Sequence, residues 1–219
     1  MRRQWVRLMF ERPYHQRIAH VLAALDGELL RQHGCLFGGG TCIALRHGEY
    51  RESVDIDFLV SDAAGYRELR QSLTGPAGLN ALVRAGAQPL TMLRDVRADQ
   101  YGLRTVVQMD GQAIKFEIVR EARIALESPG PEDVVCGIGT LTRLDLAMMD
   151  LRLPLLRAAL TKATQAYGAA VARDLTKAID RLQERQGWLE RCMQTMAMTM
   201  PRAVLWQKVR ALRRVLKAD

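Results

Sequence analysis

The sequence lacks the features that define several broad classes of protein. Only 5% of its 219 residues are aromatic, and its four cysteines are scattered, with no C-x-x-C pair and no histidine at metal-ligand spacing. A disulfide-stapled scaffold is therefore excluded, and the pattern argues against a zinc site. No apolar run approaches the roughly 20 residues that a membrane-spanning helix needs, and residues 1–7 are charged without the apolar stretch of a secretory signal. We expect a soluble, cytoplasmic protein with reduced thiols and no membrane partner.

Lysine is also scarce, although the chain is basic. Lysine and arginine number 32 against 24 aspartates and glutamates, which gives a net charge of +8, and only five of the 32 cations are lysines. Arginine is well suited to phosphate oxygens, so one interpretation is a polyanionic partner such as RNA. The other is a GC-rich genome that raises arginine everywhere. Both stay open at this point, because clustering of charge on one face is not visible in a sequence.

What the sequence does contain is a change of pattern near residue 140. Strand-like and helix-like segments are mixed before this position, and helical periodicity dominates after it. The pattern predicts an α/β or α+β domain followed by a helical part. The elements expected are helices over 14–33, 41–47, 61–73 and 201–219, a strand over 53–60, and a hairpin of strands 103–109 and 112–119 with Asp110-Gly111 as its turn.

The strongest chemical feature is the pair Asp55 and Asp57. Residues i and i+2 of a strand project to the same face, so these two carboxylates would be adjacent. Two like charges so close require compensation, and a hard cation such as Mg²⁺ is the usual one. A solvated strand face is the simpler alternative for such a pair. The residues Gly39-Gly40-Thr41, at a strand-to-helix junction, favour the metal, because glycines and a helix N-terminus together can hold a phosphate. Glu117 supplies a third acid on a later strand.

These residues carry a resemblance to a known family. Residues 37–58, FGGGTCIALRHGEYRESVDIDF, resemble the opening motif of the AbiEii/AbiGii nucleotidyltransferase toxins, which reads G-G-T-A-L, an apolar helix and then R-x-S-x-D-I-D-F. Residues 141–149 resemble the segment that opens the helical half of that family. The resemblance implies a DNA-polymerase-β-like nucleotidyltransferase domain over residues 1–140, with a small mixed sheet flanked by helices, and a helical C-terminal domain over 141–219.

The resemblance also implies an activity and its residues. It implies magnesium-dependent transfer of a nucleotide from an NTP to an RNA acceptor, the tRNA 3′ end in studied relatives, by a toxin encoded beside a cognate antitoxin. A two-metal site is expected. By position, the implied metal ligands are Asp55, Asp57 and Glu117, and the implied nucleotide-binding residues are Gly39, Gly40, Thr41, Arg51 and Ser53.

The later part of the chain departs from the family pattern. The family places a lysine after the segment that matches residues 141–149, and an R-D-x-x-D-L motif about 20 residues later. In this sequence the first lysine after residue 149 is Lys162, and only Arg173-Asp174-Leu175 resembles the second motif. Either a segment is missing after Met149, or Lys162 and Asp174 are displaced catalytic substitutes, or the protein is a degenerate relative. The alternatives to RNA transfer are therefore binding of NTP, RNA or an antitoxin without catalysis, and transfer to a protein or small-molecule hydroxyl.

Overall fold

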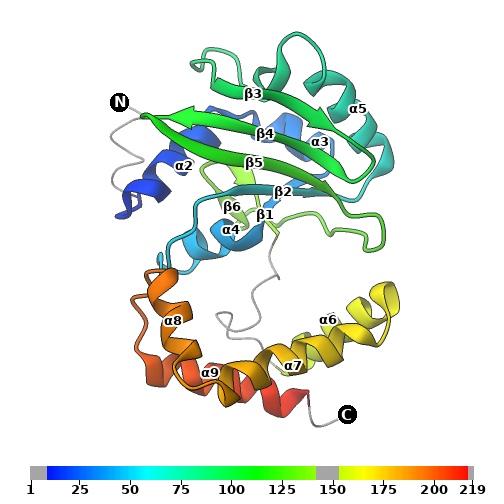
Figure 1. Cartoon of the computed structure of the whole chain (residues 1–219). Coiled ribbons are helices and arrows are strands. Elements are labelled where there is room, and N and C mark those ends of the chain that lie inside the picture. The colour runs from blue at the N-terminus through cyan, green and yellow to red at the C-terminus, as the bar shows by residue number, and fades with distance from the viewer. Residues whose placement is uncertain (1–8, 142–152, 217–219) are drawn as a thin grey trace. The chain divides into compact units, whose positions relative to one another are not determined.

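The computed structural model describes residues 9–141 and 153–216, which belong to two compact units, residues 1–144 and 145–219 (Figure 1). The first unit contains α2 (Pro13–Ala24), α3 (Gly27–Gln32), β1 (Cys35–Gly38), α4 (Gly39–Arg46), β2 (Ile56–Val60), α5 (Ala63–Leu73), the 3₁₀ helix η1 (Gly78–Leu82), β3 (Thr91–Ala98), β4 (Gly102–Met109), β5 (Gln112–Arg120), β6 (Val134–Val135) and β7 (Ile138–Gly139). The second contains α6 (Leu153–Tyr167), α7 (Ala170–Glu184), α8 (Trp188–Thr195) and α9 (Arg202–Val215).

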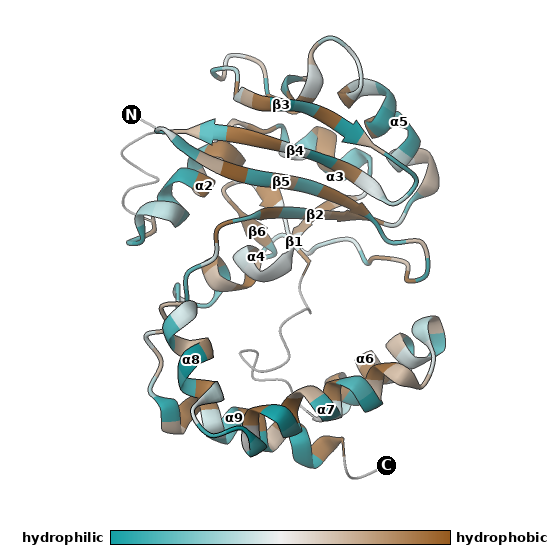
Figure 2. Ribbon diagram, viewed as in Figure 1, coloured by the Kyte–Doolittle hydropathy of each residue, from teal (hydrophilic) through white to brown (hydrophobic). Residues whose placement is uncertain are grey.

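The first unit is built on a five-stranded mixed sheet. Its strand order is β1-β2-β5-β4-β3, with β2 and β5 parallel and the other neighbours antiparallel. Hydrophilic and hydrophobic residues alternate along β4 and β5, as Figure 2 shows, so that each strand has one apolar face. The mixed α/β fold that the sequence predicts is thus confirmed.

The apolar face of the sheet carries the core of the first unit. Phe37, Phe58 and Phe116 lie on three successive strands, with ring centroids 5.6 Å and 5.4 Å apart. Helices α2, α3 and α5 lie against the sheet (Figure 1), and they contribute buried side chains such as Ile18 and Leu69 to the same cluster. With one face of β2 and β5 fixed in the core, the alternate residues of those strands must project from the opposite face.

The long helix expected over residues 14–33 is in fact two helices. Leu25 leaves the helical path to form a β-bridge with Val83, and the side chain of Asp26 accepts hydrogen bonds from the backbone N–H groups of Glu28 and Leu29. An aspartate at such a position caps a new helix, and hydrophobic periodicity alone does not reveal the break. The prediction of one continuous helix over residues 14–33 is therefore wrong.

Two strands also differ from expectation. β2 begins at Ile56 instead of residue 53, so Ser53 and Asp55 lie in the extended segment that precedes the sheet. β3 was not expected, because it is an edge strand whose side chains are mostly exposed and whose pairing with β4 has two register irregularities. An edge strand of this kind has no clean alternation for a sequence to show.

The hairpin and two helical starts agree with the sequence. Asp110 and Gly111 have φ of +48° and +76°, which is the geometry of a primed two-residue turn between β4 and β5. Asp62 caps α5 by accepting a hydrogen bond from Gly65 N–H. The helix expected from residue 41 begins two residues earlier, at Gly39, directly after β1.

The second unit is helical throughout its described residues. Its core contains Leu156 from α6, Ile179 from α7, Leu189 from α8 and several residues of α9. α9, which lies within the helix expected over residues 201–219, buries Leu205, Val209 and Leu212. Arg213 of α9 makes a bidentate ion pair with Asp180 of α7, with N–O distances of 2.7 Å and 3.1 Å. The predicted boundary between domains at residues 140 and 141 stays a prediction.

Candidate functional site

A row of aligned residues crosses the open face of the sheet. The pairing register places Gly38 of β1 opposite Asp57 of β2, Asp57 opposite Glu117 of β5, and Glu117 opposite Arg104 of β4. Adjacent strands lie about 4.8 Å apart, so these positions are immediate neighbours. The two acids of the row thus lie next to each other at the centre of the sheet, on the face that is not covered by the phenylalanine core.

The carboxylate of Asp57 lies against the glycine turn that starts α4. A Cβ atom added to Gly39 would lie 2.5 Å from Asp57 Oδ2 and 2.8 Å from Asp57 Cβ, and Gly39 has φ of +69°. Only glycine fits there without moving the carboxylate. The turn therefore brings the N-terminus of α4, with its unpaired backbone N–H groups, beside an acidic side chain.

Asp57 is half-buried, and its surroundings disfavour the charged form. Burial is the largest cause that raises the pKa of Asp57, and the negative charges of Asp55 and Glu117 raise it further, while Lys115 opposes them. Asp55 reaches this site from the segment just before β2, not from the strand itself. The two aspartates are therefore brought together as the sequence predicts, but not as successive residues on one strand face.

Arg51 lies over the second glycine of the turn. A Cβ on Gly40 would meet Arg51 Nη2. The guanidinium is held there because Nη1 donates to the carbonyl of Glu52 at 3.0 Å and Nε donates to the hydroxyl of Tyr50 at 3.2 Å. A fixed guanidinium over a helix N-terminus is a suitable partner for phosphate oxygens.

Thr41 and Ser53 form a hydrogen bond beneath this turn. Thr41 Oγ1 donates to Ser53 Oγ at 2.7 Å, and only 1% of Thr41 is exposed. The hydroxyl of Thr41 is thus directed to Ser53, and what Thr41 offers to a phosphate is its backbone N–H in the first turn of α4.

Glu117, the predicted third acid, has a basic partner. Arg104 Nε donates to Glu117 Oε1 at 2.6 Å, and Arg104 Nη1 donates to Asp99 Oδ2 at 3.0 Å. Arg104 was not singled out from the sequence, although a signal existed. The two-residue turn at Asp110-Gly111 fixes the hairpin register, and this register places Arg104 opposite Glu117.

The donor set is that of a hard cation. Asp55 and Asp57 provide carboxylate oxygens beside a glycine turn that leaves room for phosphate, and Mg²⁺ is usually held by one or two carboxylates together with substrate phosphates. Among residues 9–141 and 153–216 there is no group of three or more His, Cys, Asp or Glu arranged to hold a metal by itself. The pair therefore fits Mg²⁺ that arrives with a nucleotide better than it fits a permanently bound ion.

The two residues expected from the later motifs lie in the second unit. Lys162 is an exposed residue of α6, and Asp174 is an exposed residue of α7 next to Arg173, with an N–O distance of 3.6 Å. Their catalytic assignment stays a prediction. Residues 142–149 of the second family-like segment, and the position after Met149 where a segment could be missing, lie outside the described residues.

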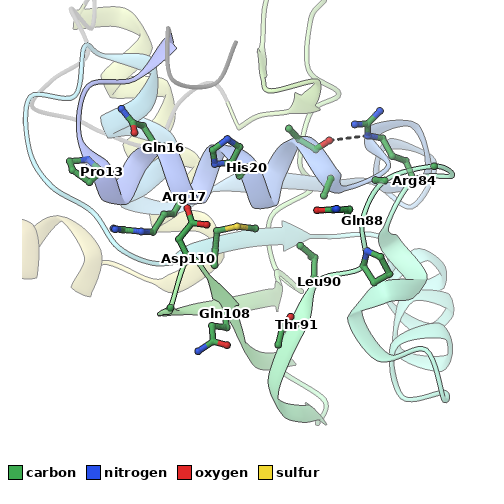
Figure 3. Close-up of a pocket in the computed structure, with 17 residues that line it drawn as sticks. Pro13, Gln16, Arg17, His20, Arg84, Gln88, Leu90, Thr91, Gln108 and Asp110 are labelled. Carbon is green, nitrogen blue, oxygen red and sulfur yellow. Dashed lines mark hydrogen bonds between the residues drawn. The ribbon is translucent and has the colours of Figure 1, made fainter. Parts of the chain in front are cut away.

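A cavity of about 940 Å³ lies elsewhere in the first unit, between α2, the loop before β3 and the β4–β5 turn (Figure 3). Arg17, His20 and Arg84 are among its lining residues, and Arg84 Nε donates to the carbonyl of Ala23 at 2.9 Å. None of the predicted site residues lines it. The cavity is thus separate from the carboxylates of the sheet.

Two solved structures from Helicobacter pylori are similar to the chain. JHP933 has 14% identity and a TM-score of 0.46, with 95% of this chain and 92% of that chain covered. A protein described as a candidate nucleotidyltransferase has 15% identity and a TM-score of 0.40, with 93% and 94% covered. Such low scores carry nothing beyond general likeness, and no curated protein matches the chain in sequence.

The family comparison is stronger. Residues 21–146 match the family described as nucleotidyl transferase AbiEii toxin, type IV TA system. The matched range is more than half of the chain and includes the glycine turn, both aspartates and Glu117. None of the described helices is both long and apolar enough to cross a membrane. The chain belongs to the AbiEii family of nucleotidyl transferase toxins of type IV toxin–antitoxin systems.

Proposed function

We propose that this protein is a magnesium-dependent nucleotidyltransferase that moves a nucleotide from an NTP to an RNA acceptor, the 3′ end of tRNA. One observation carries the proposal: a Cβ added to Gly39 would lie 2.5 Å from Asp57 Oδ2, so the start of α4 and an acidic side chain face the same small space. A triphosphate with its cation needs both, because the helix N-terminus binds phosphate and the carboxylate binds the metal.

The metal would be held by Asp55 and Asp57. When bound, Mg²⁺ would neutralise the negative charge on the phosphate oxygens. Glu117 would serve as a third ligand of a two-metal site if Arg104 releases it, since their present distance of 2.6 Å is that of a direct ion pair. The raised pKa of Asp57 supports a cation here, because the crowding of three acids is relieved by a positive ion.

The nucleotide would be held by the α4 turn. Backbone N–H groups from Gly39 to Thr41 and the guanidinium of Arg51 are the phosphate ligands that this chain offers. Ser53 supports the turn through its bond to Thr41. In the transfer, an acceptor hydroxyl oxygen forms a bond to the α-phosphorus, the bond from that phosphorus to the pyrophosphate oxygen breaks, and the hydroxyl proton leaves to a base or water. Lys162 and Asp174 are the further catalytic residues that the family resemblance implies.

A transfer assay tests the proposal. Purified protein is incubated with total tRNA, Mg²⁺ and each α-labelled NTP in turn, beside the variants Asp57→Asn and Asp95→Asn. Asp95 is an exposed residue of β3, so its variant is a matched control. We expect labelled tRNA from the wild type and from Asp95→Asn, and none from Asp57→Asn. Labelling that survives in Asp57→Asn would refute the site, and no labelling by folded wild type would refute the RNA transferase.

The ion pair between Glu117 and Arg104 favours a second candidate. A third carboxylate held by an arginine is one fewer metal ligand, so the protein could bind NTP, RNA or its antitoxin without transferring a nucleotide. Magnesium-dependent NTP binding without release of pyrophosphate from the NTP, whichever acceptor is present, would support this candidate. Pyrophosphate release with a protein or small-molecule hydroxyl, but not with tRNA, would instead identify a different acceptor.

A further inference from the structure

One histidine is completely buried close to the nucleotide site. His15 lies in the first turn of α2, is 0% exposed, and uses both ring nitrogens. Nδ1 is 2.8 Å from Glu49 Oε1, and the backbone N–H of Ser53 donates to Nε2 at 3.1 Å. His15 thus connects α2 to the segment that leads into β2.

The partners of His15 determine its protonation. A backbone N–H can only donate, so Nε2 must be the unprotonated nitrogen, and Nδ1 must carry the proton that Glu49 accepts. The ring is therefore neutral and oriented. A second proton on Nε2 would face the N–H of Ser53, donor against donor, and would break that hydrogen bond.

Glu49 is itself firmly held. Its carboxylate accepts from the backbone N–H of Glu11 at 2.7 Å and from that of Arg12 at 3.1 Å, and its carbonyl accepts from Arg12 Nε at 3.0 Å. Burial alone would raise the pKa of Glu49, but these N–H groups and His15 lower it, so Glu49 is a carboxylate. One end of the chain of hydrogen bonds is thus anchored at the start of α2.

The other end is the glycine turn. Ser53, whose N–H bonds to His15, accepts the hydroxyl of Thr41 at 2.7 Å, and Thr41 belongs to the first turn of α4. The sequence order of these groups gives no hint of the connection, since His15 is separated from Ser53 by 38 positions. The continuous series is Glu49, His15, Ser53, Thr41.

We propose that His15, oriented by Glu49, is a positioning residue that fixes Ser53 and, through Thr41, the phosphate-binding start of α4. The inference rests on the proposed function for its consequence in catalysis, but not for its geometry. His15 touches no substrate in this scheme, because it acts through Ser53. Its loss should loosen NTP binding while the sheet and its carboxylates stay in place.

The same geometry predicts a dependence on pH. Burial lowers the pKa of His15; Glu49 and Glu52 favour its charged form, and Arg12 opposes it. The lowered value means that His15 is neutral at pH 7 and is protonated only below its ordinary value of about 6.5. NTP binding should therefore weaken as the pH falls through the lowered pKa of His15.

Two variants at position 15 separate positioning from packing. In His15→Gln, the side-chain oxygen reaches the place of Nε2 and can accept from Ser53 N–H. In His15→Asn, the amide reaches the place of Nδ1 and keeps only the bond to Glu49. His20→Asn is the matched control, because His20 lies on the same helix beside the cavity of Figure 3 and its buried Nε2 has no hydrogen-bond partner among residues 9–141 and 153–216.

Kinetics with these proteins test the proposal. We expect His15→Asn to raise KM for NTP about tenfold, the factor for one lost hydrogen bond, with little change in kcat. His15→Gln and His20→Asn should stay close to the wild type. The rise of KM at low pH should be present in the wild type and absent from His15→Gln. An equal loss in the Asn and Gln variants would overturn the proposal, because it would point to packing alone.

A second readout does not need activity. Nitrogen-15 NMR of the wild type should show His15 with a protonated Nδ1 and an accepting Nε2. The amide resonances of Gly40, Thr41 and Ser53 should shift in His15→Asn and not in His20→Asn. Unshifted resonances would refute the positioning role even in an active enzyme. Shifted resonances in a protein that transfers nothing would uphold the role and refute the proposed function instead.

Discussion

At the scale of single residues, the crowded carboxylates of the site lower the stability of the folded protein. Asp57 is half-buried, the charges of Asp55 and Glu117 act on it, and the space beside its carboxylate is so small that a Cβ on Gly39 would lie 2.5 Å from Oδ2. A charge in such a position is kept for binding rather than for stability. Stabilising substitutions are commonly found at sites of this kind, at the expense of function.

Asp57→Asn should therefore stabilise the metal-free protein while it abolishes transfer. We expect a gain of roughly 0.5–2 kcal/mol in the free energy of unfolding near pH 7. Burial and like charges raise the pKa of Asp57, so the folded state holds its proton more tightly than the unfolded state. The wild type consequently recovers stability as pH falls through that raised value, and the gap between the two proteins closes. Urea unfolding in EDTA at several pH values measures this gap.

The matched control for this substitution is Asp95→Asn, at an exposed position of β3. Its unfolding free energy should stay near that of the wild type at every pH. A destabilised Asp57→Asn would contradict the view that the charge is a burden.

The glycine turn gives a second prediction at this scale. Gly39→Ala introduces a Cβ 2.5 Å from Asp57 Oδ2 at φ of +69°, whereas a Cβ at Gly48, with φ of +71°, would meet no atom of the described part of the chain within 4 Å. Both variants should lose about 1–2 kcal/mol of stability, because a left-handed backbone is strained for alanine. Only Gly39→Ala should also lose NTP binding, since only there does the new atom displace a site residue. Calorimetric titration with an NTP and Mg²⁺ distinguishes them, and equal binding by both would refute the role given to the contact.

At the scale of elements, pairing of β4 with β5 controls the third acid. The hairpin turn sets Arg104 opposite Glu117, and the ion pair neutralises a carboxylate that would otherwise face Asp57. Arg104 thus competes with any cation for Glu117, which links the register of two strands to metal affinity.

Arg104→Gln should tighten binding of Mn²⁺, used as a probe for Mg²⁺. We expect about a fivefold lower Kd, because about 1 kcal/mol for a partly exposed ion pair corresponds to that factor. Arg94→Gln, on the neighbouring strand β3, removes the same charge from an exposed position and serves as the control. Paramagnetic resonance of free Mn²⁺ measures both Kd values. Weaker binding in Arg104→Gln would mean that Arg104 supports the site instead of competing for it.

The same elements show what a sequence can and cannot predict. Asp110-Gly111 and Asp62 act locally, so the hairpin and the start of α5 follow from the residues themselves. The break at Leu25 depends on a bridge to Val83, and the short β2 depends on where β1 and β5 end. The helix break and the length of β2 therefore depend on tertiary pairing, which no local sequence pattern indicates.

The candidate site also contains residues that the sequence predicts and residues that it does not. The glycines and aspartates stand in one short motif whose chemistry is readable from residue types and spacing. His15 comes from a separate helix and is defined only by hydrogen bonds to Glu49 and Ser53. A buried histidine in an apolar helix pattern has no distinguishing signal in one sequence. Positioning residues of this kind become visible only in three dimensions.

At the scale of the whole molecule, the question is what the net charge of +8 does. In the second unit, arginines gather around an exposed aromatic ring at the start of α8. Trp188, which is 38% exposed, starts α8, and the guanidinium carbons of Arg185 and Arg191 lie 5.3 Å and 5.4 Å from its ring centroid. Exposed aromatic rings among arginines are typical of surfaces that stack nucleotide bases and hold phosphates.

Salt and mutation together separate the two contributions that this surface would make to the proposed RNA binding. If arginines contact phosphates, log K for tRNA falls linearly with log salt, and each lost contact reduces the slope by about 1 or slightly less. Arg185→Gln should therefore flatten the slope, whereas Trp188→Ala should lower affinity about tenfold at every salt concentration, since stacking of one base is worth about 1–3 kcal/mol. Fluorescence anisotropy with labelled tRNA measures both quantities. An affinity that does not change with salt in the wild type would mean that the arginine content reflects genome composition and not a polyanionic partner. In that case the +8 charge would no longer favour RNA over the other acceptors, and the choice of acceptor would depend on the transfer assay alone.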